Sequence, residues 1–397
     1  MKKFEAMNKD IFNNTEVAFA IKTDAELEKA YWLFKMIKNE SLVKLGTGVT
    51  KFALKHHFPV EGLIKTTVFD HFCGGVNEKD TLPLVDKLYA KGVYSILDYS
   101  VEGAENDETF DATLHKNLEL IEFAKNRPEI PFAVFKPTGM GRFAIYEKVS
   151  SENPLTATEQ AEWDRVVHRY DTLSKAAYDA GVPLMIDAEE TWMQKAADDL
   201  VEDMMRRYNK KEAIVFNTLQ LYRKDRLPYL KKLHQRAKKE GFKIGMKLVR
   251  GAYMEKERVR AKELGYEDPI CKDKAATDKN YNDTLAYMVS NIADMSVYAG
   301  THNEDSALYL TQLIDQYGLQ KNDKRIWFGQ LLGMSDHITF NLAKLGYNTS
   351  KYIPFGPVKD VMPYLIRRAE ENTSVAGQTN RELELLSAER KRRKLQD

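Results

Sequence analysis

Two adjacent arginines near the end of the chain are the residues best suited to chemistry. In the segment YIPFGPVKDVMPYLIRRAEEN (352–372), the residues Tyr364, Arg367, Arg368 and Glu371 are spaced i, i+3, i+4 and i+7. A helix places residues at this spacing on one face. Guanidinium groups bind carboxylates and phosphates through two parallel hydrogen bonds, so an inward-facing stripe predicts an anion site. A solvent-exposed ion pair between Arg367 and Glu371 would explain the same spacing.

A second cationic segment, KLVRGAY (247–253), follows the apolar start of a predicted strand. Lys247 and Arg250 lie beside Gly251 and Ala252, small residues that let a ligand approach the backbone closely. Positive charge beside small residues suits a pyrophosphate group. A glycine-containing loop with surface cations is the alternative interpretation.

Several common site signatures are absent or poorly placed. The chain has no GxxxxGK[ST] and no GxSxG sequence, which disfavours a P-loop nucleotidase and the common hydrolase elbow. The stretch GMGRFA (139–144) matches GxGxxA but lacks an acidic residue at the end of the next strand, so we interpret it as an ordinary loop. Histidines at metal-binding spacing do not occur near a predicted strand end, and we expect no metal site.

The elements that must position these residues alternate between strands and helices. Short apolar runs rich in β-branched residues, separated by amphipathic segments, predict eight strands at 93–99, 131–137, 183–189, 213–220, 243–251, 296–302, 325–332 and 351–356. Near-continuous apolar strands in a βα alternation indicate a parallel sheet covered on both faces. Eight such units favour an α/β fold of the (β/α)8 barrel type over an open sheet.

Polar residues follow the apolar part of these strands. In a (β/α)8 barrel the functional groups lie at the carboxyl ends of the strands. Read in order, those ends carry Asp98, Lys136, Thr138, Asp187, Glu189, Gln220, Lys247, Arg250, Thr301, His302, Gln330 and Tyr352. The set predicts a polar pocket with an excess of positive charge.

The remaining segments and the composition set the context. We expect residues 1–85 to form a helical arm, 86–380 the barrel and 381–397 a charged helical tail, whose basic cluster could contact an anionic membrane surface but better fits a solvated helix end. A net charge of +1 gives no global field for nucleic acid. Two cysteines far apart and a polar amino terminus without the apolar run of a secretion signal favour a cytoplasmic protein.

The motifs together resemble one family. The chain contains, in the family's order, the motifs LDYSVEG, VFNTLQLY, KLVRGAYMEKER, GTHNEDS and YLIRRAEEN. Together they resemble proline dehydrogenase over about residues 60–380, in its monofunctional, mitochondrial-type branch. The resemblance implies a distorted (β/α)8 barrel that binds FAD. It also implies oxidation of L-proline to Δ1-pyrroline-5-carboxylate, with hydride moving from proline C5 to flavin N5 and electrons passing to a membrane quinone.

The resemblance also implies roles for individual residues. Arg367 and Arg368 would clamp the proline carboxylate, and Asp98 would orient the site by ion pairing with the arginines and a lysine. The remaining substrate contacts would come from Lys65, Leu331, Tyr352 and Tyr364. The cofactor contacts would come from Gln220, Val249, Arg250, Gly251, Ala252, Lys274, Thr301, His302 and Glu371, with Lys247 supplying positive charge near flavin N5.

A departure at Lys247, an argument on substrate choice at Tyr352 and three alternatives accompany this interpretation. Lys247 stands where bifunctional members carry arginine, which keeps the charge but loses the planar fork. Tyr352 favours proline, because related hydroxyproline dehydrogenases have a smaller residue there. The alternatives are a hydroxyproline dehydrogenase, a flavin barrel of the methylenetetrahydrofolate-reductase type reduced by NADH, and a non-catalytic barrel used for protein interaction.

Overall fold

The computed structural model describes residues 10–39, 68–100, 105–362, 364–366 and 376–395. All eight predicted strands are present: β1 Val93–Tyr99, β2 Ala133–Phe135, β3 Leu184–Ile186, β4 Val215–Gln220, β5 Ile244–Val249, β6 Met295–Gly300, β7 Ile326–Leu331 and β8 Thr349–Phe355. β2 is shorter than the predicted 131–137. Pro137 has no N–H to donate to a ladder and begins the short helix η3 instead.

Helices separate the strands along most of the described chain. The helices are η1 Asp10–Asn13, α2 Thr15–Ala18, α3 Asp24–Ile37, α6 Asp70–Phe72, α7 Glu78–Tyr89, α8 Asp107–Ala124, η3 Pro137–Gly139, α9 Phe143–Ser150, α10 Ala157–Ala180, α11 Thr191–Tyr208, α12 Arg226–Glu240, α13 Met254–Leu264, α14 Lys274–Ser290, α15 Glu304–Gln316, α16 Asp336–Lys344 and α18 Ala376–Arg392. Residues 358–362 and 364–366 are also helical.

The strand order is that of a (β/α)8 barrel. Neighbouring strands follow the order β1-β8-β7-β6-β5-β4-β3-β2. The pairs β1 with β8 and β2 through β6 are parallel, as a βα alternation requires. The predicted fold class is therefore confirmed, whereas the predicted domain boundaries remain predictions.

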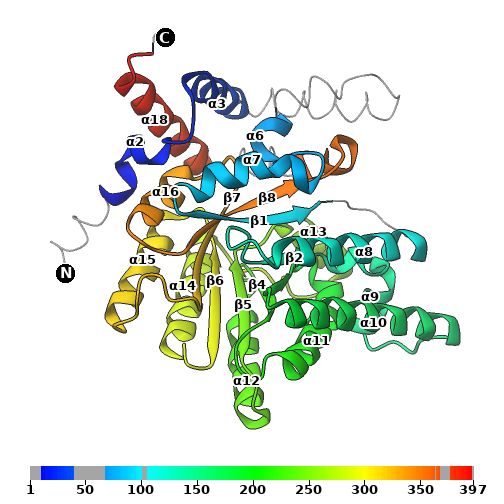
Figure 1. The fold of residues 1–397 in the computed structure, drawn as a ribbon. Coiled ribbons are helices and arrows are strands. Elements are labelled where there is room, and N and C mark those ends of the chain that lie inside the picture. Colours follow the sequence, from blue (N-terminus) through cyan, green and yellow to red (C-terminus); the bar gives the residue numbers. More distant parts are fainter. Residues whose placement is uncertain (1–9, 40–67, 101–104, 363, 367–375, 396–397) are drawn as a thin grey trace. The chain divides into compact units, whose positions relative to one another are not determined.

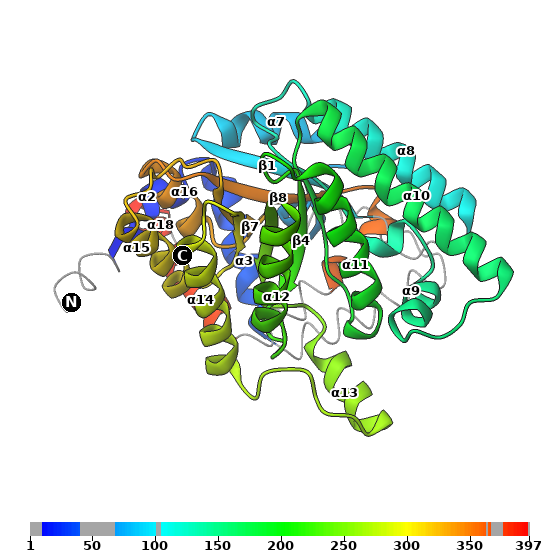
Figure 2. The same ribbon diagram turned by 90° about the horizontal axis from the view of Figure 1, so that it is seen from below.

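The chain divides into two compact units. The central unit comprises Gly103–Phe328, and the split unit comprises Met1–Glu102 with Gly329–Asp397. In the central unit β4, β5 and β6 run side by side (Figure 1), and α8 lies along α10 (Figure 2). Buried aromatic rings fill the space between its strands, with Phe132 packing edge-on against Phe216, Tyr298 and Trp327.

Local sequence signals explain where the longest helix of the central unit begins and ends. Thr156 and Glu159 form a capping box at the start of α10, each side chain bonding the other's backbone N–H at 3.3 and 2.8 Å. Gly181 ends the helix with a φ of 68°, a left-handed conformation that suits glycine. These caps satisfy backbone groups at both ends of the helix.

In the split unit, α18 packs beside α3 (Figure 1). Leu385 and Leu386 of α18 join an apolar cluster with Leu27 and Phe34 of α3. The basic end of α18 is partly buried. Arg390 donates a hydrogen bond to Glu28 at 2.5 Å and is only 4% exposed. The tail is thus helical as predicted, but the prediction of a solvated end is wrong for this arginine. None of the described helices has the length and apolar character needed to cross a membrane.

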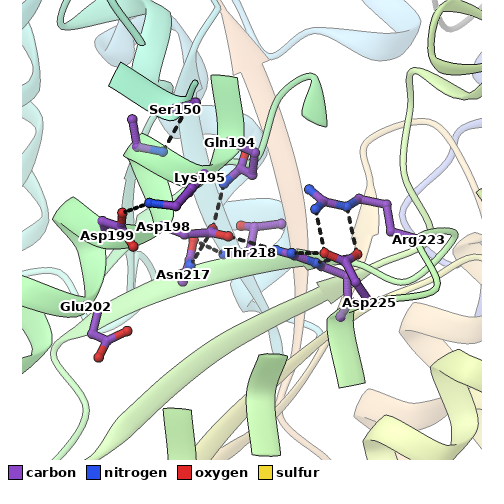
Figure 3. A network of polar contacts seen from close by, with 12 residues as sticks. Ser150, Gln194, Lys195, Asp198, Asp199, Glu202, Asn217, Thr218, Arg223 and Asp225 are labelled. Carbon is purple, nitrogen blue, oxygen red and sulfur yellow. Dashed lines mark hydrogen bonds and ion pairs between the residues drawn. The ribbon is translucent and has the colours of Figure 1, made fainter. Parts of the chain in front are cut away.

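A buried ion pair joins α11 to α12 in the central unit, on the helix-covered face of β4 (Figure 3). Asp198 of α11 accepts hydrogen bonds from Arg226 of α12 at 2.7 Å and from Asn217 of β4 at 2.9 Å. Gln194 donates to the same carboxylate at 2.9 Å. Asp198 and Arg226 are 3% and 6% exposed, and Asp198 shares the compensation of the buried Arg226 charge with Asp225, which accepts two further hydrogen bonds from Arg226.

We predict that Asp198→Asn lowers the free energy of unfolding by about 3 kcal/mol, because it leaves the Arg226 charge buried with less compensation. Denaturant unfolding of the wild type and the variant measures the difference. The matched control is Lys195→Ala, which removes an exposed pair with Asp199 and should cost less than about 1 kcal/mol. Equal stabilities of the wild type and Asp198→Asn would contradict a structural role for the pair.

Candidate functional site

Three charged residues at the carboxyl ends of β2, β3 and β5 form a bridged group in the central unit. Asp187 accepts a hydrogen bond from Lys247 Nζ through Oδ1, and its Oδ2 lies 3.4 Å from Lys136 Nζ. The Lys247 side chain is only 7% exposed and those of Asp187 and Lys136 16%. Asp187 therefore bridges Lys136 and Lys247, and Glu189 is a further carboxyl that interacts with Lys136.

Glu189, two residues beyond Asp187, is a buried carboxyl with an unusual protonation equilibrium. It accepts hydrogen bonds from the backbone N–H and the hydroxyl of Thr138 at 2.9 and 2.7 Å. Burial raises its pKa from 4.5 to about 7, and the nearby charge of Glu190 acts in the same direction. The group therefore exchanges its proton near neutral pH.

The alternation of β4 places Gln220 on the face of the sheet that is turned away from the helices. Asn217 reaches Asp198 on α11, so residues one and three positions later point to the opposite face. Gln220 is 2% exposed, and within the described chain its Oε1 has no hydrogen-bond partner. A buried acceptor without a donor fits a ligand that supplies an N–H. Val249 pairs with Gln220 on the neighbouring strand, and Lys247 pairs with Thr218.

Arg250 is held in place by three side chains. Its Nε donates to Asp278 Oδ1 at 2.8 Å, while its terminal nitrogens donate to Thr301 at 2.7 Å and Ser306 at 3.0 Å. Lys274 lies 2.5 Å from the other oxygen of Asp278. The structure thus brings together three of the predicted cofactor contacts, Arg250, Thr301 and Lys274. His302 follows Thr301 in the loop that joins β6 to α15.

The loop after Arg250 exposes its backbone. Gly251 and Ala252 are both exposed, and Gly251 has a φ of 128°. A Cβ added at Gly251 would lie 2.3 Å from the Tyr222 ring, so only glycine fits this turn. Exposed backbone beside Arg250 and Lys274 provides donors and positive charge of the kind that pyrophosphate needs. The residues present therefore fit a dinucleotide cofactor.

The loop at 139–144 has a packing role. A Cβ added at Gly141 would lie 2.4 Å from Val166 of α10, and Arg142 forms a double hydrogen bond with Glu162 of the same helix at 2.8 and 2.5 Å. The GxGxxA match is therefore explained by close contact with a helix, in agreement with its interpretation as an ordinary loop.

In the split unit, Tyr352 and Asp98 point to one face of the β1–β8 pair. Lys351 bonds Asp336 of α16 at 2.7 Å, so the next residue, Tyr352, points away from that helix. Tyr352 pairs with Ile96, and Asp98 lies two residues further along β1. Asp98 is 2% exposed and accepts a hydrogen bond from Ser100 Oγ at 2.5 Å. These two predicted substrate residues thus share a face.

Leu331 and Tyr364 belong to one apolar cluster of the split unit, together with Phe69, Phe72 and Met362. Their roles as substrate contacts remain predictions. Gln330 has a different role from the one its strand-end position predicted. Its Oε1 accepts a hydrogen bond from Thr339 of α16 at 2.8 Å, so the side chain fastens a helix instead of lining the predicted pocket.

Four predicted site residues lie outside the described residues: Lys65, Arg367, Arg368 and Glu371. Their roles remain predictions. Other residues were missed by sequence reasoning, because neither Asp278 nor Ser306 lies at a strand end. The spacing of Lys274 and Asp278 signals an i,i+4 pair on α14, but nothing in the sequence connects Asp278 to Arg250. Asp187 was expected at a strand end, though not as the partner of Lys247.

The pKa of Glu189 predicts a pH-dependent stability. Because its folded pKa is raised, the neutral form favours folding. That contribution is complete below the ordinary glutamate pKa and is lost as pH rises through about 7. We predict that Glu189→Gln reduces the loss of unfolding free energy between about pH 5 and pH 8, by a difference on the order of 3 kcal/mol. Denaturant unfolding at both pH values checks this. Parallel pH profiles of wild type and variant would contradict it.

Comparisons with known proteins agree on one family. The family model described as "Proline dehydrogenase" matches residues 81–381. CarD of Pectobacterium carotovorum subsp. carotovorum, a carbapenem antibiotics biosynthesis protein, is 37% identical over 84% of this chain and 86% of its own. The mitochondrial proline dehydrogenase 1 of Homo sapiens is 43% identical over 60% of this chain. The matched region covers 40% of the human protein.

A solved structure supports the fold. Proline utilization A of Bdellovibrio bacteriovorus, inactivated by N-propargylglycine, aligns with a TM-score of 0.76 at 19% identity, covering 96% of this chain and 43% of its own. At that identity the likeness concerns the fold alone. The match of the family model across both groups of site residues carries the assignment. This chain belongs to the proline dehydrogenase family.

Proposed function

We propose that this protein oxidises L-proline to Δ1-pyrroline-5-carboxylate with FAD as its cofactor and passes the electrons to a membrane quinone. Family membership supports the oxidation of proline. The structural observation that best supports a flavin is the exposed backbone of Gly251 and Ala252 next to Arg250, together with the buried Oε1 of Gln220, which has no hydrogen-bond partner within the described residues. When bound, FAD would accept hydride from proline C5 at its N5 position.

The central unit supplies the residues that would hold the cofactor. Buried Lys247 would stabilise negative charge on a nearby reduced ring, since Coulomb attraction is strong where water is excluded. Gln220 Oε1 would accept a hydrogen bond from a ring N–H. The phosphates would lie at Arg250, Gly251 and Ala252, with the more distant contacts from Val249, Lys274, Thr301 and His302.

The split unit supplies the residues that would bind proline. Tyr352 and Leu331 would pack against the pyrrolidine ring, Asp98 would influence the charge of the site, and Tyr364 would complete the apolar wall. Arg367 and Arg368 would hold the carboxylate in two-point fashion, with Glu371 and Lys65 beside them. Fixing a small zwitterion in this way converts binding energy into orientation for hydride transfer.

Location and context extend the proposal. A quinone acceptor implies that the protein works in the cytoplasm at the inner face of the membrane, with peripheral contact. The similarity to CarD suggests a second context, carbapenem antibiotic biosynthesis. A proline derivative would then outcompete L-proline as the reductant of the flavin.

We predict that L-proline bleaches the visible absorbance of the FAD-loaded protein under anaerobic conditions, because hydride transfer reduces the flavin. An anaerobic titration followed by absorbance spectroscopy measures this. NADH serves as the control that identifies a methylenetetrahydrofolate-reductase-type enzyme. If excess proline leaves the spectrum unchanged, the proposed function is wrong, and if no flavin binds, a non-catalytic barrel is favoured.

Tyr352 provides a test of substrate choice. We predict that Tyr352→Ser raises the ratio of kcat/KM for hydroxyproline to that for proline by about tenfold, because the smaller side chain makes room for a ring hydroxyl. Steady-state kinetics with both substrates measure the ratio, and Tyr352→Phe is the control that keeps the ring. An unchanged ratio in the serine variant would remove Tyr352 as the selecting residue.

A further inference from the structure

The proposed phosphate loop is connected directly to a helix with few apolar contacts. Arg250, Gly251, Ala252 and Tyr253 link β5 to α13, so the position of the loop depends on where α13 is held. The only buried side chains of α13 are Glu257 and Ala261. Its larger apolar residues point to solvent, since Met254, Val259 and Leu264 are 40%, 52% and 61% exposed. Hydrophobic burial therefore contributes little to the position of this helix.

A buried carboxylate supplies the attachment that apolar packing lacks. Glu257 is 0% exposed, and its two oxygens accept hydrogen bonds from the backbone N–H and the hydroxyl of Thr191 at 2.7 and 2.5 Å. Thr191 is the first residue of α11, a helix without a side-chain cap of its own. Glu257 thus caps α11 from another helix. Burial raises the pKa of its carboxyl, and the hydrogen bonds from Thr191 act in the opposite direction and favour the charged form.

Weaker contacts of α13 run to the same region. Lys256 lies 3.0 Å from Glu190. Arg260 bonds Glu147 of α9 at 2.6 Å and stacks over the Trp192 ring at 4.5 Å. These side chains are considerably more exposed than Glu257 and add less to the attachment. α11 itself is fastened by the Asp198–Arg226 pair, so Glu257 ties the loop to a rigid part of the central unit.

From this arrangement we infer that Glu257 is a positioning residue for cofactor binding. By capping α11 it fixes the start of α13 and thereby holds the backbone of Gly251 and Ala252 ready for the phosphates of the flavin dinucleotide. The inference rests on the proposed function, because it assumes that this loop binds FAD. It assigns to Glu257 a role in affinity for the cofactor and none in the chemistry of proline.

The test measures how tightly FAD is held. We predict that Glu257→Gln weakens FAD binding about tenfold, since a charge-assisted double contact becomes a mismatched one. Dilution of the purified flavoprotein, followed by the recovery of free-flavin fluorescence, gives the dissociation constant. The matched control is Glu255→Gln on the exposed side of the same helix, which should bind FAD as the wild type does. At saturating FAD, kcat and KM for proline should remain unchanged.

A second pair of variants separates positioning from general destabilisation. Thr191→Val removes the hydroxyl donor and should weaken FAD binding in the wild type, but much less in the Glu257→Gln background. Thr191→Ser keeps the hydroxyl and should bind FAD with wild-type affinity. A lower melting temperature of the FAD-free Glu257→Gln variant with unaltered FAD affinity would overturn the inference. So would a loss of turnover that saturating FAD does not restore.

The outcomes also distinguish this inference from the proposed function. If the unaltered protein binds no FAD, the proposed function fails and the inference fails with it. If the unaltered protein binds FAD and is reduced by proline, while Glu257→Gln retains FAD equally well, only the role of Glu257 is refuted.

Discussion

Buried positive charge at the carboxyl ends of the strands is the constraint that organises the central unit. Lys247 is almost enclosed, and a lone ammonium group in that position would lose its hydration without compensation. Asp187 provides the compensation through its hydrogen bond with Lys247, and its second oxygen lies near Lys136 Nζ. One carboxylate therefore fixes the relative positions of three strand ends.

The two faces of each strand make different contacts. On the face covered by helices, polar side chains attach the strands to those helices. Asn217 bonds Asp198 of α11, and Lys351 bonds Asp336 of α16. On the opposite face, the next residues along the strands are Thr218 and Tyr352 in these two cases. Because the side chains of a strand alternate strictly, fastening one face determines which residues the other face presents. The stability of the fold and the composition of the site are therefore linked through strand register.

Sequence reasoning succeeded where the signal was local. The apolar runs located all eight strands. The glycine and cations of residues 247–253 marked a loop whose Arg250 bonds Asp278 and Thr301. It failed where a long-range partner decided the role. Gln330 lies next to the end of β7, yet its side chain bonds Thr339 of α16. Asp278 lies in the middle of a helical pattern, and its contact with a residue 28 positions away has no local signature.

The sequence by itself determined the order of strands and helices, the fold class and the family, because apolar periodicity, helix caps and short motifs are written within a few residues. Only the tertiary structure decided which charges meet. Asp187 binds Lys247 across 60 residues, and Glu257 caps α11 across 66. Such pairs form because burial makes an unpaired charge or helix end costly, and the partner is whichever group the fold brings within reach.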